Sequence, residues 1–325
     1  MLVSVLLFAV GLVLLIKGGD WFVDGATGIA KRFNLPDIVV GATVVSIGTT
    51  LPEVMVSTTG ALQGSGAMAY GNAIGSIICN TALIAAISIT CNPGPVNTKS
   101  MKTPAIFFFV SAALYCLASY VLGEFPRWMG FVMLAIFVVY MITTVRNGLK
   151  NPDSAHEEDA EEGVKERTLV MELVLLVVGA AVIAVGADLL VEHGQVIALG
   201  LGVPETVVAL LFVALGTSLP ELVTTITSLR SGHASLGVGN VIGANVFNLV
   251  LVSGVAVSLA PFKVPCENFL LDTGLNMSLV FEIPVMLGVM CLMIFPALAT
   301  KKLHRWQGIA LLGIYAAFCV CQFVL

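Results

Sequence analysis

Two glutamates that end matching six-residue motifs are the side chains of this sequence best placed to do chemistry. The motif GTTLPE ends at Glu53, and GTSLPE ends at Glu221. Each carboxylate has neighbouring hydroxyl side chains, which are Thr49, Thr50, Thr217 and Ser218. A hard cation such as Ca²⁺ takes about six to eight oxygen ligands, with carboxylates prominent among them. The motifs therefore predict two halves of a cation site.

The surroundings of both glutamates make an uncompensated charge expensive. Glu53 lies in the middle of the apolar run 37–62, and Glu221 lies in the equivalent part of the run 204–230. A charged side chain at the centre of a bilayer costs roughly 2.5–3.5 kcal/mol on insertion scales. Neither run supplies an Arg or Lys at similar depth. Two unpaired carboxylates inside a membrane predict a cationic ligand.

A proline precedes each glutamate and predicts a break in each helix. Pro52 and Pro220 each remove a backbone donor and clash with the preceding turn. The carbonyls that this frees are tolerated in a membrane where a broken helix lines a cavity. The hydroxyl and the carboxylate of each motif also match a capping box. Both interpretations are compatible, because a capping box would restart the helix after the break.

A second pair of motifs follows the first, with GNAIGSIICN at 71–80 and GNVIGANVFN at 239–248. Their glycines recur every four residues and predict a helix face that permits close backbone packing. These glycines are Gly71, Gly75, Gly239 and Gly243. Asn72 and Asn240 fit an interhelical hydrogen bond as well as they fit an ion site.

The composition places most of the chain in lipid. Of 325 residues, 58% are hydrophobic and 11% are charged, whereas soluble domains have about 45–50% and about 25%. This excludes a cytosolic enzyme, a secreted disulfide-bonded domain and a disordered protein, and the net charge of −5 argues against nucleic acid as a partner. The histidines lie in loops or near the ends of apolar runs, which disfavours an intramembrane hydrolase.

Ten apolar runs are long enough to cross a bilayer, which takes about 20 residues in a helix. They are 2–30, 37–62, 70–91, 103–122, 126–146, 169–191, 204–230, 235–260, 278–299 and 306–325. With the N-terminus outside, the basic residues of the loops fall almost entirely on the inner side, and only Arg127 and Lys263 fall in outer loops. This distribution follows the positive-inside rule. It predicts external or periplasmic termini and a cytoplasmic acidic linker at 147–168.

The two halves of the sequence are related by a fixed offset of 168 residues, the separation of the two GT[TS]LPE motifs. The offset pairs Asp20 with Asp188, Pro36 with Pro204, Asn72 with Asn240 and Asn80 with Asn248. No gap is needed from Gly11 to Leu83, so duplication is the economical explanation. Each half holds five runs, and because five is odd the second half must cross the membrane in the opposite sense.

Inverted repeats of this kind are typical of secondary transporters, whose substrates bind where the repeats meet. The predicted fold class is an all-α integral membrane protein with ten transmembrane helices as two inverted five-helix repeats, with broken helices 2 and 7. The first repeat is predicted at 1–146, the linker at 147–168 and the second repeat at 169–325.

The two motif pairs resemble the α-repeats of the calcium/cation antiporter superfamily, and the chain is similar to small prokaryotic sodium/calcium exchangers. The resemblance covers the whole chain and implies a rigid core of spans 2, 3, 7 and 8, past which spans 1 and 6 slide. The ligands it implies are Thr49, Thr50, Glu53, Ser76 and Asn80 from the first repeat and Thr217, Ser218, Glu221 and Asn248 from the second. Main-chain carbonyls near Ser46 and Ala214 are expected to complete the shell.

The chain departs from the family pattern at two positions. Asn248 stands where prokaryotic and potassium-dependent members often have Asp, and Ala244 stands where many have Ser. The resemblance still implies a secondary antiporter that exchanges Na⁺ for Ca²⁺ across a bacterial inner membrane. It implies no cofactor and no obligatory protein partner.

Other functions stay open at this point. A Ca²⁺/H⁺ antiporter would protonate the two glutamates instead of binding Na⁺, and a K⁺-dependent Na⁺/Ca²⁺ exchanger is a further alternative. A passive channel is disfavoured, because two carboxylates would bind cations too tightly for fast release. Asp20 and Asp188, late in the first and sixth spans, fit interfacial anchoring or gating as well as ion contact.

Overall fold

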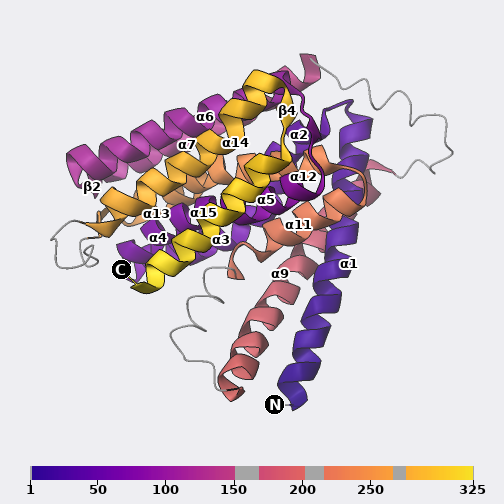
Figure 1. The fold of residues 1–325 in the computed structure, drawn as a ribbon, viewed down its shortest axis with the longest axis horizontal. Coiled ribbons are helices and arrows are strands. Elements are labelled where there is room, and N and C mark those ends of the chain that lie inside the picture. The colour runs from indigo at the N-terminus through magenta and orange to yellow at the C-terminus, as the bar shows by residue number, and fades with distance from the viewer. Residues whose placement is uncertain (1, 151–167, 202–215, 266–275, 325) are drawn as a thin grey trace.

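The computed structural model describes residues 2–150, 168–201, 216–265 and 276–324. These residues form an almost entirely helical bundle with two short β-ribbons (Figure 1). The helices of the first half are α1 (Leu2–Arg32), α2 (Asp37–Val40), α3 (Ser46–Leu62), α4 (Gly66–Cys79), α5 (Ala86–Cys91), α6 (Thr98–Cys116) and α7 (Arg127–Lys150). Those of the second half are α9 (Leu169–Gly200), α11 (Leu219–Arg230), α12 (Ala234–Phe247), α13 (Ser253–Leu259), α14 (Ile283–Thr300) and α15 (Arg305–Val324).

Five π-helical segments extend or join these helices. They are η1 (Gly41–Val45), η2 (Asn80–Ala85), η3 (Leu117–Leu122), η5 (Asn248–Val252) and η7 (Ser278–Glu282). The segments η1, η2 and η5 each link two α-helical pieces into one continuous rod. A π segment adds a residue to a turn, and such bulges occur frequently at functional sites.

Eight helical rods in the described part of the chain are long and apolar enough to cross a membrane. They coincide with eight of the ten predicted spans. Of the other two, the run 204–230 is described only from Gly216 onward, and the run 306–325 corresponds to α15. The sixth span is longer than predicted, because α9 continues to Gly200. Most of the predicted linker 147–168 lies outside the described residues.

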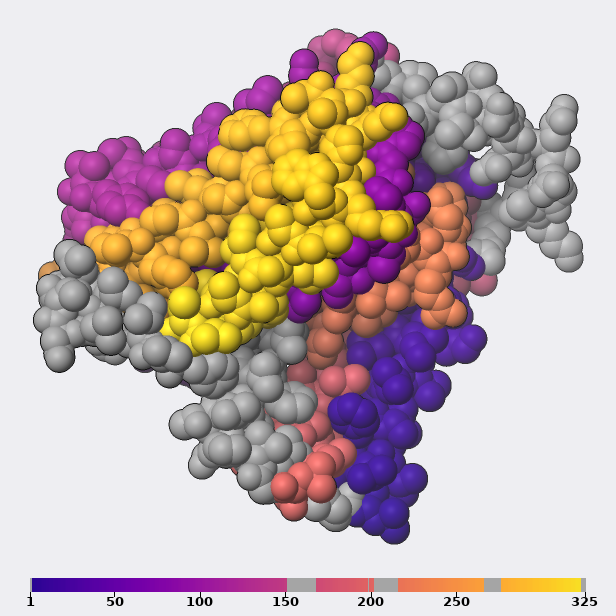
Figure 2. Space-filling model, viewed as in Figure 1, coloured from indigo at the N-terminus to yellow at the C-terminus, as the bar shows by residue number. Residues whose placement is uncertain are grey.

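Burial distinguishes central helices from peripheral ones. Of the apolar window in the α12–α13 rod, 83% is buried, and of that in the α4–α5 rod, 72%. The corresponding fractions are 28% for α1 and for α7 and 22% for α9. In Figure 1, α1 and α9 lie side by side and extend beyond the rest of the bundle. Figure 2 shows them as the indigo and salmon surface below the yellow helices α14 and α15.

Glycines allow α1 and α9 to pack backbone against backbone. A Cβ added at Gly11 would lie 2.9 Å from the carbonyl oxygen of Gly186, and one added at Gly186 would lie 2.9 Å from that of Gly11. Gly18 and Gly179 approach each other in the same way. The earlier glycine of each helix meets the later glycine of the other, so the two helices run antiparallel. Small residues are the usual means of close helix packing in membranes.

Two β-ribbons connect the halves of the chain. The strand β1 (Gly94–Pro95) pairs antiparallel with β4 (Lys302–Leu303). The strand β2 (Glu124–Phe125) pairs in the same way with β3 (Phe262–Lys263). Each ribbon therefore takes one strand from each half.

The predicted break of the second span is wrong in its position. The helix α3 runs without interruption from Ser46 through Pro52 to Leu62, and the irregular turn is η1, which lies before it. The capping-box prediction is also wrong, because Thr50 lies inside α3 and Ser218 makes no side-chain cap bond. The helix α3 packs against α4, α12 and α13, and it continues through the proline. In the seventh span α11 begins at Leu219 with Ser218 at its N-cap, and the part of the span before Gly216 lies outside the described residues.

Candidate cation site

The two motif glutamates lie together in the centre of the bundle. Glu53 is carried by α3 and Glu221 by the first turn of α11, and both side chains have 0% exposure. Their carboxyl groups are close enough to interact electrostatically. Within the described residues, neither forms a hydrogen bond or an ion pair through its carboxylate oxygens. Two adjacent like charges without a basic partner form a strongly cation-attracting centre.

Six of the nine predicted ligands carry buried polar atoms that have no hydrogen-bond partner among the described residues. They are Thr50, Glu53, Asn80, Ser218, Glu221 and Asn248, all between 0% and 1% exposed. Buried polar groups in folded proteins are nearly always satisfied, because burying one without a partner is costly. So many orphaned oxygens in the two motif pairs fit a bound cation better than a packing role.

The other three predicted ligands are hydroxyls that donate to two asparagines. Thr49 Oγ1 donates to Asn240 Oδ1 at 3.1 Å. Thr217 Oγ1 donates to Asn72 Oδ1 at 3.4 Å, and Ser76 Oγ donates to the same oxygen at 3.5 Å. A hydroxyl that donates its proton in this way keeps its lone pairs for a cation.

The two asparagines whose role the sequence left open are positioning residues. Asn240 Oδ1 also accepts from Ser46 Oγ at 3.3 Å, and Asn72 Nδ2 donates to Ser57 Oγ at 2.8 Å. Each asparagine thus holds a threonine of the opposite half. The sequence contained a signal for this, because Asn72 and Asn240 share one offset with Thr49 and Thr217. It gave no indication of Ser46 or Ser57 as their partners.

Asn80 and Asn248 occupy the same local structure in their two halves. Asn80 is the first residue of η2 and Asn248 is the first residue of η5. Both follow directly on the helix that carries the glycine-rich motif, α4 or α12. The wider π turn shifts the residues that follow it around the helix axis. Each amide is therefore set at a point where the helix changes its winding. The segment η5 contacts α3, which carries Glu53, and η2 contacts α11, which carries Glu221.

The glycine faces of the two motifs can be compared only in part. A Cβ at Gly243 would lie 2.6 Å from both Cα and O of Ala42, and one at Gly239 would lie 2.8 Å from Cα of Ile38. The predicted close packing is therefore present in the second half. Around Gly71 and Gly75 no described atom lies within 4 Å, and positions 206 and 210, which correspond to Ile38 and Ala42, lie outside the described residues.

The donor set suits a hard cation. The described residues contain no cluster of three or more His, Cys, Asp or Glu side chains. The candidate site thus combines two carboxylates with neutral hydroxyl and amide oxygens. The two carboxylates carry a formal charge of −2, which one divalent cation or two monovalent cations can balance. Oxygen-only ligation favours Ca²⁺, Mg²⁺ or alkali ions over thiophilic metals.

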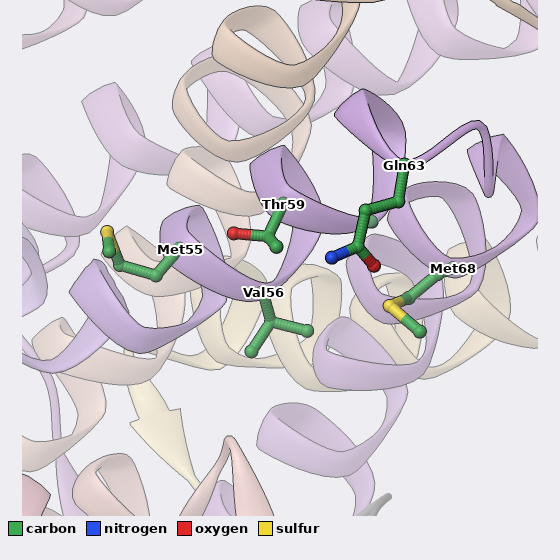
Figure 3. Close-up of a pocket in the computed structure, with 6 residues that line it drawn as sticks. Met55, Val56, Thr59, Gln63 and Met68 are labelled. Carbon is green, nitrogen blue, oxygen red and sulfur yellow. The ribbon is translucent and has the colours of Figure 1, made fainter.

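A cavity of about 1160 Å³ lies between α3 and α9 and reaches the motifs of both glutamates. Pro52 and Pro220 line it, together with the hydroxyl residue Thr217. A smaller hollow of about 320 Å³ lies at the end of α3, between Met55 and Met68 (Figure 3). The two share Met55 and Val56 in their linings.

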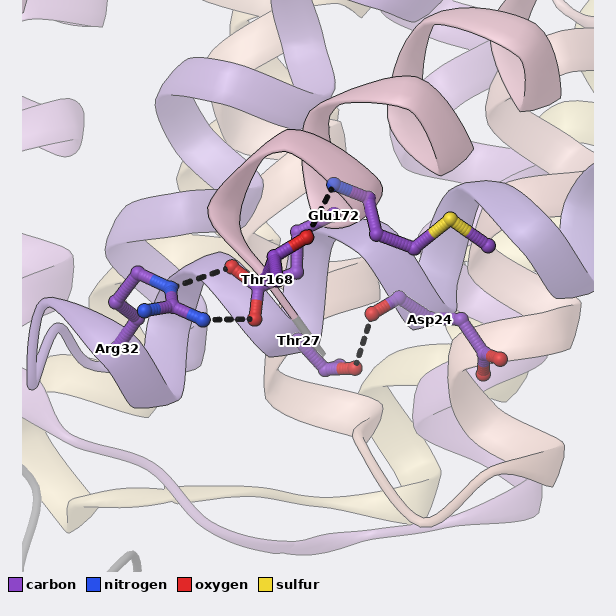
Figure 4. A network of polar contacts seen from close by, with 6 residues as sticks. Asp24, Thr27, Arg32, Thr168 and Glu172 are labelled. Atoms are coloured by element: carbon purple, nitrogen blue, oxygen red, sulfur yellow. Dashed lines mark hydrogen bonds and ion pairs between the residues drawn. The ribbon is translucent and has the colours of Figure 1, made fainter. Parts of the chain in front are cut away.

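An ion pair joins the end of α1 to the start of α9 (Figure 4). Arg32 Nε donates to Glu172 Oε2 at 2.8 Å, and Arg32 Nη2 donates to Glu172 Oε1 at 3.1 Å. The absence of a side chain at Gly28 leaves room for Glu172, since a Cβ there would lie 2.8 Å from its Cγ. This bidentate contact reinforces the glycine packing of the two helices.

The arrangement of orphaned oxygens agrees with the family resemblance. Comparison with known sequences decides to which family the chain belongs. The sequence pattern described as "Sodium/calcium exchanger protein" matches residues 3–146 and 171–324. The chain belongs to this exchanger family. It is therefore a multi-pass membrane protein of a cation-exchanging family, as the resemblance implied.

Similar proteins cover nearly the whole chain. The sodium/calcium exchanger MaX1 of Methanosarcina acetivorans is 30% identical over 99% of this chain and 99% of its own length. An uncharacterised membrane protein of Methanocaldococcus jannaschii is 32% identical over 95% of this chain and 94% of its own length. A solved structure of the sodium–calcium exchanger NCX_Mj, soaked with Na⁺ and Sr²⁺, matches with a TM-score of 0.80 and 31% identity, covering 98% of both chains. Two of these relatives, MaX1 and NCX_Mj, are named as sodium/calcium exchangers.

Proposed function

We propose that this exchanger is a secondary antiporter that exchanges Na⁺ for Ca²⁺ by alternating access. The observation that carries the proposal is the pair Glu53 and Glu221, one from each half, fully buried and without a partner among the described residues. The ions named for MaX1 and NCX_Mj support the choice of Na⁺ and Ca²⁺. The cycle needs no cofactor and no protein partner.

Competition for the two carboxylates couples the ions. One Ca²⁺ neutralises both, and so do Na⁺ ions that share the same oxygens, but the two species cannot both be fully bound. When ions occupy the site it is nearly neutral, so the helices can move and open it to the other side of the membrane. With bare carboxylates the same movement would take two charges through a region of low dielectric constant, which is costly. The protein without bound ions should therefore not switch its access, and each ion can cross only in exchange for the other.

Flux of ⁴⁵Ca into proteoliposomes under imposed Na⁺, K⁺ or H⁺ gradients tests the proposal. An outward-directed Na⁺ gradient alone should drive calcium uptake. Uptake driven by a proton gradient without sodium would select the Ca²⁺/H⁺ alternative. An absolute need for K⁺ alongside Na⁺ would select the K⁺-dependent exchanger, and channel currents in planar bilayers would contradict exchange altogether.

We further propose that the chain crosses the membrane ten times as two inverted repeats. The contacts between the halves support this, because they occur in exchanged pairs. Thr49 bonds to Asn240, and the residues 168 positions from each of these, Thr217 and Asn72, also bond to each other. The glycines of α1 and α9 follow the same rule. The strand β3 lies 168 positions after β1 in the sequence, and each of these two strands pairs with a strand from the other half.

The orientation we propose places both termini outside or in the periplasm and the linker 147–168 in the cytoplasm of a bacterial inner membrane. The lipid-facing belt would be the exposed apolar side chains of the bundle, such as Val110, Phe131 and Ile142. This orientation rests on the concentration of Lys and Arg in the inner loops.

Cysteine labelling tests the orientation. In a variant that lacks the native cysteines, Lys150→Cys at the end of α7 should react with an impermeant thiol reagent only from the cytoplasmic side. Lys263→Cys in β3 should react only from the outside. Both side chains are exposed, so access depends on the side of the membrane alone. Labelling of both from the same side would contradict the ten-span topology.

Asn248 provides a test of charge balance at the site. We propose the nine ligands Thr49, Thr50, Glu53, Ser76, Asn80, Thr217, Ser218, Glu221 and Asn248. With asparagine at 80 and 248, only the two glutamates are charged, so bound Ca²⁺ leaves the site near neutral. Wild-type exchange is therefore expected to run without potassium. A third carboxylate, in Asn248→Asp, should require an extra proton or K⁺ beside Ca²⁺.

The measurement is Na⁺-driven calcium flux at several pH values, with choline replacing potassium, for wild type and Asn248→Asp. The variant should depend more steeply on pH or on K⁺ than wild type does. Asn248→Gln, which keeps the amide, serves as the control and should gain neither dependence. A wild-type protein that stops without potassium would overturn the charge-balance argument.

A further inference from the structure

The cavity between α3 and α9 carries an unexplained acidic end. Asp188 and Glu192 of α9 line it, followed one turn later by Gln195. On the same helix, nearer its start, the lining residues are apolar and include Leu176, Ala180 and Ala184. The cavity therefore has an apolar part beside the glutamate motifs and a charged part further along α9.

The two carboxylates have no structural role in the described part of the chain. Neither Asp188 nor Glu192 takes part in an ion pair or a hydrogen bond with another described residue. They stand in a span whose mean hydropathy is 2.7, the highest of the eight candidate spans. Charged residues within such spans usually face water-filled paths and serve transport.

The cavity leads from these carboxylates to polar atoms that lack partners. Thr217 stands on the cavity wall. The next residue, Ser218, is 1% exposed, and its hydroxyl has no hydrogen-bond partner among the described residues. Pro52 and Pro220, which also line the cavity, directly precede Glu53 and Glu221. A cation that enters at the acidic end would meet the orphaned oxygens at the other.

The same acidic pair recurs on α1. The repeat offset takes Asp188 to Asp20 and Glu192 to Asp24. Because α1 and α9 run antiparallel, the two pairs lie toward opposite ends of this helix pair. The α1 pair differs, since Lys17 Nζ lies 3.8 Å from Asp20 Oδ2 and the equivalent position on α9 is Val185. Asp24 also has a partner, and neither residue of the α1 pair lines the cavity.

We propose that Asp188 and Glu192 form a vestibule that concentrates cations for the site on one side of the membrane. The inference rests on the proposed antiport function and names the residues that set apparent affinity on that face. A cavity wall of low dielectric strengthens the field of carboxylates that no basic side chain offsets. Among the described residues, neither Asp188 nor Glu192 has such a basic partner.

The valence of the ions makes the effect measurable. A potential ψ multiplies the local concentration of a cation of charge z by exp(−zeψ/kT), so the factor for Ca²⁺ is the square of that for Na⁺. Neutralising a vestibule that concentrates Na⁺ about threefold should raise half-saturating Na⁺ about threefold and half-saturating Ca²⁺ about ninefold. The maximal rate should be unchanged, since the site itself is intact.

The test compares right-side-out and everted membrane vesicles at fixed ionic strength. The variant Asp188→Asn/Glu192→Gln should lose apparent affinity on one face only. The variant Asp20→Asn/Asp24→Asn is the matched comparison, because it neutralises the equivalent pair on α1, which does not line the cavity, and it should change neither face. Glu124→Gln, which removes an exposed charge from β2 away from the cavity, serves as the control and should change neither face.

Ionic strength supplies a second readout. Choline chloride raised toward 1 M shortens the Debye length to about 3 Å and should remove most of the difference between wild type and variants. Equal losses on both faces, equal factors for Na⁺ and Ca²⁺, or a loss insensitive to salt would each overturn the vestibule. A wild type without Na⁺-driven calcium flux would instead contradict the proposed function, so the two failures are distinguishable.

Discussion

Replacing either Glu53 or Glu221 by glutamine is expected to abolish calcium exchange and to leave the protein folded. Glutamine preserves the size of the side chain and removes only its charge. Both carboxylates are fully buried, so nothing else in the described site can neutralise a dehydrated cation. Removing one partner from a buried charge pair costs about 2–5 kcal/mol, and about 3 kcal/mol already weakens binding more than a hundredfold.

The measurement is Na⁺-driven ⁴⁵Ca flux in proteoliposomes, with the thermal unfolding midpoint in detergent as the check on folding. Glu282→Gln is the matched control, because Glu282 also lies in a predicted span. Its carboxylate accepts from Ser278 Oγ at 2.7 Å and from Gln322 Nε2 at 3.3 Å, away from the candidate site. The control should keep near-normal flux. Normal flux in a Glu53 or Glu221 variant would show that this carboxylate is not a ligand.

Folding should if anything benefit from the loss of charge. In the protein without bound ions, two like charges lie close together in the buried centre of the bundle, which destabilises the fold. Each glutamine variant is therefore expected to have an unfolding midpoint at least equal to that of ion-free wild type. Added Ca²⁺ should raise the midpoint of wild type and fail to raise that of the variants, because a ligand stabilises only the state that binds it.

The sequence predicted the residues of the candidate site better than their local structure. Residue type and repeat spacing were enough to select Glu53 and Glu221, because a carboxylate in an apolar span is costly wherever it lies. The structure brings both glutamates together, and the ligand assignment itself stays a prediction. The capping box failed for a physical reason. Whether a proline ends a helix or is carried through it depends on the packing around it, which a motif does not contain.

The π segments and the partners of the asparagines could not be predicted for a related reason. A π turn at Asn80 or Asn248 leaves no mark in local composition, since it is stabilised by the helices around it. The bond from Thr49 to Asn240 joins residues 191 positions apart, and only the three-dimensional approach of α3 to α12 creates it. The spacing of Gly239 and Gly243 did predict a close approach of α12 to some helix, without indicating which one.

Because α12 approaches η1 so closely at Gly243, we expect Gly243→Ala to lower both stability and transport. In a helix, alanine in place of glycine normally stabilises by roughly 0.5–1 kcal/mol. At Gly243 the sign should reverse, because the new Cβ would lie 2.6 Å from Cα and O of Ala42, backbone atoms that cannot rotate away. Overpacking of this kind costs about 1–3 kcal/mol or more. The Cβ would also press on the Ser46 hydroxyl, which bonds to Asn240.

The strain should therefore distort the candidate cation site as well as destabilise the fold. Separating α12 from η1 would lengthen the bond by which Asn240 holds Thr49, one of the proposed ligands. We expect an unfolding midpoint several degrees below wild type, with most Na⁺-driven calcium flux lost. Gly288→Ala and Gly313→Ala are the controls, since a Cβ at either position meets no described atom within 4 Å. These should match wild type or exceed it slightly in midpoint. If Gly243→Ala behaved as they do, α12 would not pack against η1 as closely as the structure has it, and the positioning role of Asn240 would have to be abandoned.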